Sequence, residues 1–370
     1  MKIAIIRLSA LGDIIQSAVV LQFIKKFKKD IEIHWFVDEK FEGILKNHPL
    51  IDKLYALPLK DKKIIQSLKI LLEARKNNYN AVMDLQGLVK SAIVSRILSR
   101  NNFGFDKNSL KESFAHNFYN QKLNIDYNEN VFVRYLGLTS FMLNKYFDPK
   151  DLAFKEDVFS VDEKLKQLLS EKMQLTKNKK NILIHVGSSE ENKIYPKTKL
   201  ALLCKLIIKE FPEIKIFLGW GNLKEYEFAK EVIELGAISQ DNIEIAPKFS
   251  LKEYEFAKEV IELGAISQDN IEIAPKFSLE ELIVFTKSMD LIIGNDSGPT
   301  HLAFALNRPS ITIFGATPSY RNAFKTNINK IIDTGKKITN AKHLDKSDFC
   351  ISTIEEEDIL KLVKELLGDE

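Results

Sequence analysis

The sequence predicts an α/β protein of two domains, each built on a parallel β-sheet covered by helices. The chain of 370 residues exceeds the usual size of one hydrophobic core. Hydrophobic residues make up 45% and charged residues 28%, the proportions of a folded globular protein. Short β-branched runs alternate with helical patterns in both halves. We place the domains at residues 1–165 and 166–350, with a helix in 351–370 that could pack back on the first domain.

The first half opens on an apolar run, Lys2–Arg7, that predicts a strand. Its four apolar residues before Arg7 are too few for the apolar part of a secretory signal. The alternation of strand and helix patterns after it favours a parallel sheet. The further elements expected here are a helix at Ile14–Lys28, strands at Ile31–Val37 and Lys53–Leu57, a helix through Leu68–Leu72 and a strand at Ala81–Leu85.

The same alternation resumes after a stretch rich in lysine and acidic residues near 150–180, so the domain boundary is expected there. The second series consists of strands at Asn181–Gly187, Ile214–Trp220, Leu291–Gly294 and Ser310–Gly315, with a helix from about Lys197. A final amphipathic helix is expected at about Ile354–Leu367.

One segment occurs twice: Leu223–Ser250 and Leu251–Ser278 are identical over 28 residues. A solenoid needs at least about three imperfect units with caps, so an in-frame duplication or an assembly error explains the pair better. Each copy contains a helix, a glycine turn and a strand, and ends in a serine followed three residues later by glutamate, a helix-capping pattern. A doubly wound sheet has a fixed strand order, so we expect one copy to be surplus.

Composition excludes several classes of function. The net charge is only +3 with basic residues dispersed among acidic ones, which argues against a nucleic-acid partner. The sequence has no uninterrupted run of about 18 apolar residues, so no transmembrane helix is predicted. Cys204 and Cys350 lie far apart without metal-type spacing, so we expect reduced thiols in a cytoplasmic protein.

The turn after the first strand, Ser9–Asp13, lies where a parallel sheet meets its ligands. It has one glycine, Gly12, and therefore lacks the G-x-G-x-x-G pattern of nicotinamide and flavin sites. In the simplest alternative, Gly12 is a turn residue and Asp13 an N-cap.

Two segments of the second domain suit phosphate. Ser188, Ser189 and Lys193 follow a strand and offer hydroxyls and a positive charge, although a polar surface loop would look the same. Pro299 is placed to open a helix after Asn295–Gly298, and the free N–H groups of such a helix start attract an anion. His301 in its first turn is either structural or part of that site.

Four segments in order complete a pattern: S-A-L-G-D at 9–13, Q-G-L-V-K-S at 86–91, S-S-x-x-x-K-x-Y-P at 188–196 and D-S-G-P-T-H at 296–301. From Lys2 to about Ala323 the chain resembles the lipopolysaccharide heptosyltransferases of glycosyltransferase family 9. The first segment looks most like the ADP-heptose heptosyltransferases of type I. The resemblance implies the GT-B fold, with two Rossmann-like domains facing across a cleft, the first for the acceptor and the second for the ADP-sugar donor.

The resemblance also implies roles for single residues. Asp13 would be the general base, and Lys193 would stabilise the departing diphosphate. The implied donor-binding residues are Ser188, Ser189, Lys193, Glu225, Asp296, Ser297, Gly298 and His301, with Glu225 holding the ribose. The implied acceptor-binding residues are Lys60, Lys63, Lys90 and Lys111. Lys111 stands where the family commonly has arginine, which keeps the charge but weakens bidentate recognition.

The implied reaction is inverting transfer of heptose from ADP-L-glycero-D-manno-heptose to Kdo of Kdo-lipid A, without metal or cofactor. The enzyme would be peripheral at the cytoplasmic face of the inner membrane. No D-x-D motif lies beside the phosphate contacts, which agrees with a metal-independent reaction. The alternatives are a type II heptosyltransferase acting on the first heptose, a GT-B epimerase or hydrolase of nucleotide sugars, and a protein inactivated by the duplication.

Overall fold

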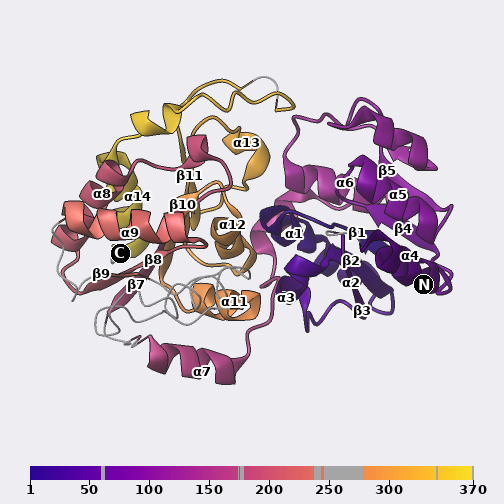
Figure 1. Cartoon of the computed structure of the whole chain (residues 1–370), viewed down its shortest axis with the longest axis horizontal. Helices are drawn as coiled ribbons and strands as arrows, with labels where there is room; N and C mark the ends of the chain where they lie inside the picture. The colour runs from indigo at the N-terminus through magenta and orange to yellow at the C-terminus, as the bar shows by residue number, and fades with distance from the viewer. Residues whose placement is uncertain are drawn as a thin grey trace.

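The structure is a computed structural model that describes residues 1–59, 63–173, 175, 179–236, 243–245, 278–338 and 341–368. The described chain forms two lobes, each with a six-stranded sheet and helices packed against it (Figure 1). All strand pairings in both sheets are parallel, as the alternating sequence pattern predicted.

The first sheet has the strand order β3-β2-β1-β4-β5-β6. Its strands are β1 Lys2–Ile6, β2 Glu32–Asp38, β3 Lys53–Leu57, β4 Ala81–Asp84, β5 Asn102–Phe105 and β6 Gln121–Leu123. The helices of this lobe are α1 Leu11–Ala18, α2 Val20–Phe27, α3 Glu42–Leu45, α4 Ile64–Arg75, α5 Val89–Leu98 and α6 Val131–Leu143. The order reverses between β1 and β4, so ligands are expected at the carboxyl ends of these two strands.

The second sheet has the order β12-β11-β10-β7-β8-β9 and reverses between β7 and β10. Its strands are β7 Lys180–His185, β8 Ile214–Gly219, β9 Ile243–Ile245, β10 Leu291–Asn295, β11 Ser310–Phe314 and β12 Asn329–Asp333. The helices are α7 Glu163–Lys172, α8 Lys197–Glu210, α9 Leu223–Gly236, α11 Leu279–Lys287, α12 Gly298–Ala305, α13 Ser319–Asn322 and α14 Glu356–Leu367.

The first repeat copy supplies α9 and β9, in the order its sequence predicted. The second copy lies outside the described residues except for Ser278. The Ser278 hydroxyl accepts the N–H of Glu281, and the Glu281 carboxylate accepts the N–H of Ser278, so the predicted capping box is present.

The ends of the two lobes differ from expectation. Helix α7 packs against α11, so the whole helix belongs with the second lobe, although the boundary expected at residue 165 falls inside it. Helix α14 begins two residues after the predicted Ile354 and packs against α8 and β11. Residues 351–370 were expected to allow a return to the first domain, but the apolar face of α14 with Ile359, Val363 and Leu367 joins the core of the second lobe instead.

The lobes meet where α1 lies beside α12 (Figure 1). A Cβ atom on Gly12 would lie 3.1 Å from the Cα atom of Gly298, so the two helix starts approach too closely for ordinary side chains. Gly12 therefore lies inside α1, where α1 contacts the start of α12, and not in a turn as the sequence suggested. Close packing of two backbones is the physical reason for glycine at both positions.

Candidate active site

Two cavities lie on either side of the start of α1, and Ala10 lines both. The N-terminal cavity, of about 360 Å³, is lined by Arg7, Asp13, Lys111, Arg134 and other residues of the first lobe, together with Arg321 of the second. The interdomain cavity, of about 320 Å³, is lined by residues 10–12 and Phe41 of the first lobe and by the carboxyl ends of β7 and β8 and the start of α12. Both cavities therefore open where parallel sheets bind ligands.

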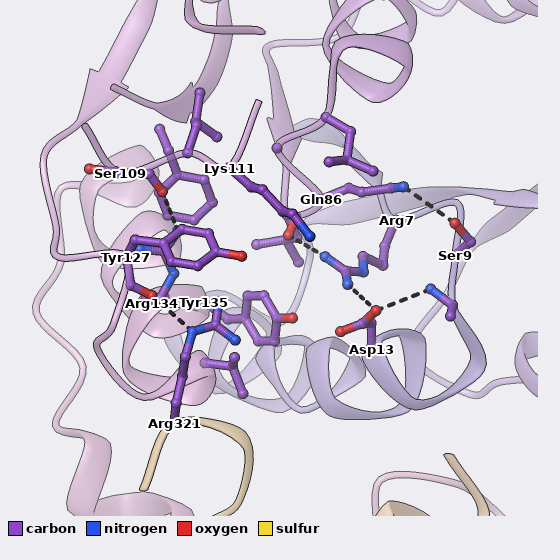
Figure 2. Close-up of a pocket in the computed structure, with 17 residues that line it drawn as sticks. Arg7, Ser9, Asp13, Gln86, Ser109, Lys111, Tyr127, Arg134, Tyr135 and Arg321 are labelled. Carbon is purple, nitrogen blue, oxygen red and sulfur yellow. Dashed lines mark hydrogen bonds and ion pairs between the residues drawn. The ribbon is translucent and has the colours of Figure 1, made fainter. Parts of the chain in front are cut away.

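Asp13 is the third residue of α1 and lines the N-terminal cavity. Helix α1 begins at Leu11, so Ala10 and not Asp13 is the N-cap. The Asp13 carboxylate accepts the N–H of Ala10 at 3.2 Å and pairs with the Arg7 guanidinium at 2.8 Å (Figure 2). Both contacts use the Oδ2 atom of the carboxylate, and 44% of the Asp13 side chain remains exposed. The carboxylate is therefore held in place and is still accessible from the cavity. Such a carboxylate can accept a proton from a hydroxyl that enters the cavity.

Arg7 lies at the end of β1 and is buried. Its Nη1 donates to the carbonyl of Leu85 at 2.7 Å, which joins the ends of β1 and β4. Burial is the largest influence and acts to lower the pKa of Arg7, but the charges of Asp13, Tyr135 and Asp84 and the hydrogen bond to Asp13 together outweigh it, so the pKa is raised. The arginine is therefore charged, and its charge is directed at Asp13.

Gln86 shows what the Q-G-L-V-K-S segment does. Its Oε1 accepts the N–H of Leu8 at 2.8 Å and its Nε2 donates to the Ser9 hydroxyl at 3.3 Å. The side chain thus ties the loop after β4 to the turn that leads into α1. Both loops line the N-terminal cavity.

Three further cations line the N-terminal cavity: Lys111, Arg134 and Arg321 (Figure 2). Arg134 donates to the carbonyls of Ser109, at 2.7 Å, and Asp126, at 2.6 Å, so it fixes the loop between them. Burial, followed by the neighbouring charge of Arg321, lowers the pKa of Arg134 to about 10, which still leaves it charged near neutrality. A cavity with this much positive charge suits an anionic ligand.

Cationic side chains from both lobes lie close to the ring of Tyr127. The guanidinium of Arg321 lies 4.5 Å and that of Arg134 5.3 Å from its ring centre, and the Lys342 ammonium lies at 5.2 Å. Arg321 also donates to the carbonyl of Tyr127 at 2.9 Å. These contacts hold the cavity loop of the first lobe against the second lobe.

The predicted acceptor lysines are dispersed. Lys111 lines the N-terminal cavity. Lys90 is exposed near the start of α5 and Lys63 lies 3.8 Å from Glu39, and neither lines this cavity. Lys60 lies outside the described residues. Arg7, Arg134 and Arg321 were not predicted as site residues, although a charged residue inside the apolar helix run 131–143 was a usable signal for Arg134.

The interdomain cavity contains most of the predicted donor contacts: Ser188, Ser189, Glu225, Ser297 and Gly298. Within the described part of the chain, the buried Ser188 hydroxyl has no hydrogen-bond partner. A buried polar atom of this kind that lines a cavity suits a ligand that completes its bonding. The start of α12, with Ser297 as N-cap and Pro299 in the first turn, adds free N–H groups and a positive dipole end, as predicted.

Glu225 lies in the first turn of α9 and lines the interdomain cavity. Its carboxylate accepts the N–H of Gly221 at 2.6 Å and the side-chain amide of Asn222 at 2.8 Å. These bonds fix the carboxylate while leaving acceptor capacity for hydroxyl groups of a ligand.

Asp296 differs from the other predicted donor contacts because it is buried and already bonded. Its carboxylate lies 3.3 Å from the Lys193 ammonium and 3.0 Å from Nε2 of His301, and it accepts the hydroxyl of Thr317 at 3.0 Å. Burial acts to raise the pKa of Asp296, but the His301 hydrogen bond and the Lys193 charge outweigh burial and hold it well below the usual range. Asp296 therefore positions Lys193 and His301 rather than facing a phosphate. Neither Lys193 nor His301 lines the interdomain cavity in this structure.

One acidic group among the described residues has carboxylates close enough to share a cation: Glu355, Glu356 and Glu357. Lys199 pairs with the first two, and none of the three lines either cavity. We assign no metal to this group. In the same described ranges no helix is both long and apolar enough to cross a membrane.

The chain matches the profile described as glycosyltransferase family 9 (heptosyltransferase) over residues 67–257 and 254–348. It is 91% identical, over 370 residues and 100% of both chains, to a Campylobacter coli protein called lipopolysaccharide heptosyltransferase 1. The chain belongs to glycosyltransferase family 9. The resemblance inferred from the four sequence segments is thereby confirmed.

Three further proteins that this glycosyltransferase resembles are less similar to it. Lipopolysaccharide heptosyltransferase 1 of Escherichia coli K12 is 24% identical over 330 residues, which are 86% of this chain and 88% of the relative. The E. coli heptosyltransferase WaaC solved with ADP has a TM-score of 0.71 at 21% identity, with 99% and 100% of the two chains covered. E. coli ADP-heptose lps heptosyltransferase II has a TM-score of 0.70 at 18% identity, with 99% and 98% covered. These structures confirm the predicted GT-B fold.

Proposed function

We propose that this glycosyltransferase moves heptose from ADP-L-glycero-D-manno-heptose to Kdo of Kdo-lipid A, with inversion, in inner-core lipopolysaccharide synthesis. The relative that is 91% identical is a lipopolysaccharide heptosyltransferase 1. One solved relative is described with ADP-2-deoxy-2-fluoro heptose, which supports the donor. The geometric observation that carries the proposal is the place of Asp13 in the N-terminal cavity, three residues after Ala10, which lines both cavities.

The N-terminal cavity is the proposed acceptor site. Kdo carries a carboxylate, and guanidinium groups bind carboxylates with paired hydrogen bonds. Lys111 and Arg321 line the cavity and supply positive charge for that group. Among the implied acceptor lysines that the structure describes, only Lys111 has this support, so the arginines are the better candidates for the remaining contacts.

The interdomain cavity is the proposed donor site. The unpartnered Ser188 hydroxyl and the N–H groups at the start of α12 suit the diphosphate. Glu225 suits the ribose, because its carboxylate is held in place at the cavity wall and carboxylates accept hydrogen bonds from hydroxyl groups. The Lys193 ammonium pairs with Asp296, which lies just before the start of α12. From this position the positive charge of Lys193 would offset the negative charge that develops on the leaving phosphate.

In the proposed reaction, the acceptor hydroxyl attacks the anomeric carbon from the N-terminal cavity while Asp13 takes its proton. The bond from the anomeric carbon to the β-phosphate oxygen breaks, and its electron pair leaves with ADP. Attack from the face opposite the leaving group inverts the anomeric centre. Lys193 and the positive end of α12 supply positive charge without a metal ion.

A lipid-linked acceptor also implies work at a membrane surface. We therefore infer that the enzyme is peripheral at the cytoplasmic face of the inner membrane. This inference rests on the proposed acceptor.

The proposal is tested by ADP release from ADP-heptose in three reactions: with a Kdo-bearing acceptor, with an acceptor that already carries the first heptose, and with no acceptor. We expect turnover only with the Kdo acceptor. Turnover only on the heptose-bearing acceptor would make the enzyme type II. Conversion of the donor alone would indicate an epimerase or hydrolase, and no turnover in any reaction would favour inactivation by the duplication.

A further inference from the structure

Helix α4 exposes a row of large aliphatic side chains to solvent in the described structure. Its side chains are Ile64 and Ile65, each 70% exposed, Leu68, 42% exposed, and Leu72, 49% exposed. At 3.6 residues per turn these positions form one continuous stripe along the helix. We call these four residues the α4 stripe.

The stripe is not needed to hold α4 in the fold. The adjoining face contains the buried residues Ser67, Leu71 and Ala74. Leu71 and Ala74 belong to the core on one side of the first sheet, and the Ser67 hydroxyl donates to the carbonyl of Pro58 at 2.8 Å. The helix is therefore anchored by one face and exposes large aliphatic side chains on the adjoining face. A continuous exposed stripe of this kind indicates an interaction surface.

The charges around the stripe are nearly all positive. Lys63, Lys69, Arg75 and Lys76 are exposed, and Glu73 is the one acidic residue among positions 63–76. Glu73 pairs with Lys76. Lys69 and Lys76 lie along the solvent-facing side of the stripe and Arg75 lies beyond its C-terminal end, so its exposed border is cationic. An apolar face bordered by lysine and arginine is complementary to an anionic lipid surface.

The α4 stripe begins on the side of the first lobe where the N-terminal cavity opens. Helix α4 follows β3, so its first turn lies at the carboxyl edge of the first sheet, the edge at which the N-terminal cavity opens after β1 and β4. Its neighbour α5 follows the Gln86–Leu88 loop that lines this cavity. A surface bound to the start of α4 is thereby on the acceptor side of the molecule.

We propose that α4 is an interfacial helix whose stripe inserts into the headgroup region of an anionic lipid bilayer, with its cations on the lipid phosphates. The inference deepens the proposed function, because it gives the surface that presents the N-terminal cavity to a lipid-linked acceptor. Its chemistry is nevertheless separate from catalysis, since none of the four stripe residues lines either cavity.

The test is sedimentation of the full chain with vesicles of phosphatidylethanolamine and phosphatidylglycerol, against vesicles of phosphatidylcholine alone. Three variants are compared with the wild type. The first changes Ile64, Ile65, Leu68 and Leu72 to Gln, and the second changes Lys69 and Arg75 to Gln. The control changes Leu168, Leu202 and Leu235 to Gln, because these leucines of the second lobe are 63%, 42% and 50% exposed.

We expect the wild type and the control to bind the anionic vesicles, and binding to weaken with added salt. The stripe variant should lose at least about tenfold in partitioning, and the charge variant should lose binding to anionic vesicles. ADP release with an acceptor stripped of its acyl chains should be unchanged in both variants. Absence of ADP release from every protein, while the wild type and the control still bind vesicles and the stripe variant does not, would refute the proposed function and leave this inference standing.

Vesicle binding by the stripe variant equal to that of the wild type would overturn the inference. So would absence of binding by the wild type. Sedimentation equilibrium without lipid gives a further check: a wild-type dimer that the stripe variant abolishes would show that the stripe binds a second copy of the chain instead.

Discussion

The carboxylate of Glu225 occupies the space that a side chain on Gly187 would need. A Cβ atom on Gly187 would lie 2.0 Å from the carboxyl carbon of Glu225. The glycine after β7 and the glutamate in the first turn of α9 are thus one unit of the interdomain cavity.

Gly187→Ala should weaken donor binding by about tenfold or more, because the Glu225 carboxylate must move away from its place in the cavity. Stability should change little, since the displaced group is the end of a flexible side chain. Calorimetric titration with ADP and a thermal melt measure the two effects. In a double-mutant cycle, Gly187→Ala should add nothing to Glu225→Ala. Additive losses would show that Gly187 acts independently of Glu225.

Asp13→Asn should lower kcat by roughly two to four decades while leaving donor affinity nearly intact. The amide keeps the shape of the carboxylate and can still accept the N–H of Ala10, but it cannot take the acceptor proton. Turnover measured beside calorimetric donor affinity checks this. Near wild-type turnover would remove Asp13 as the base.

Lys193→Ala should reduce both donor affinity and kcat, with the larger effect on kcat, because charge on the leaving phosphate grows in the transition state. Lys197→Ala is a matched control, since Lys197 pairs with Glu231 near the same loop. Steady-state kinetics of both variants give the comparison. A change in melting temperature alone would assign Lys193 to holding the buried Asp296.

Stability should fall with acidification because of a buried histidine. Burial lowers the pKa of His48 to about 4, against 6.5 for an ordinary histidine. Between these values the unfolded chain binds a proton that the folded chain does not, so the free energy of unfolding decreases as pH falls through about 6.5 and levels off near the folded pKa. From pH 8 to pH 5 this histidine should contribute a loss on the order of 2 kcal/mol.

Urea unfolding at the two pH values measures this loss in the wild type, in His48→Gln and in His343→Gln. The exposed His343 is the control, and its variant should retain the wild-type pH dependence. A pH dependence of His48→Gln equal to that of the wild type would contradict the assignment. The difference between pH values is the readout, because the substitution itself also changes stability.

Deletion of residues 251–278 should give a folded protein at least as stable as the intact chain. Ser250 would then precede Leu279, Glu280 and Glu281, which restores the capping box observed at Ser278. The two family matches, 67–257 and 254–348, meet in the first residues of the second copy, so the first match includes one copy and the second match most of the other, which supports one of the two copies being surplus. Thermal melts and donor affinity of both proteins decide the matter. A shortened protein that fails to fold or bind would show that the second copy is integral.

The sequence was sufficient for the fold where apolar runs are long. Strand β3 has the predicted bounds, and β1, β7, β8, β10 and β11 differ by one or two residues. The short strands β5 and β6 were missed because Asn102–Phe105 contains a glycine and Gln121–Leu123 is mostly polar. Their pairing comes from neighbouring strands and not from local pattern.

The candidate site was only partly predictable. Residues that follow a strand, such as Asp13 and Ser188, can be found because topology fixes where strand ends meet. Arg134 and Arg321 are 187 positions apart and meet at the N-terminal cavity, where the side-chain amide of Asn130, the N-cap of α6, donates to the carbonyls of Tyr320 and Ala323. A pattern along the chain cannot show such a meeting. The corrected position of Asp13 in α1 has the same origin, since the start of that helix is set by its contact with α12.

Each cavity is lined in part by residues of the other lobe. Arg321 of the second lobe lines the N-terminal cavity, and Ala10, Leu11, Gly12 and Phe41 of the first lobe line the interdomain cavity. Exchange of whole lobes between related enzymes would therefore not exchange acceptor or donor preference cleanly. A chimera joined in the connection before α7 would inherit a mixed lining in both cavities. A design that transfers substrate specificity would therefore have to transfer, together with a lobe, the residues of the other lobe that line its cavity.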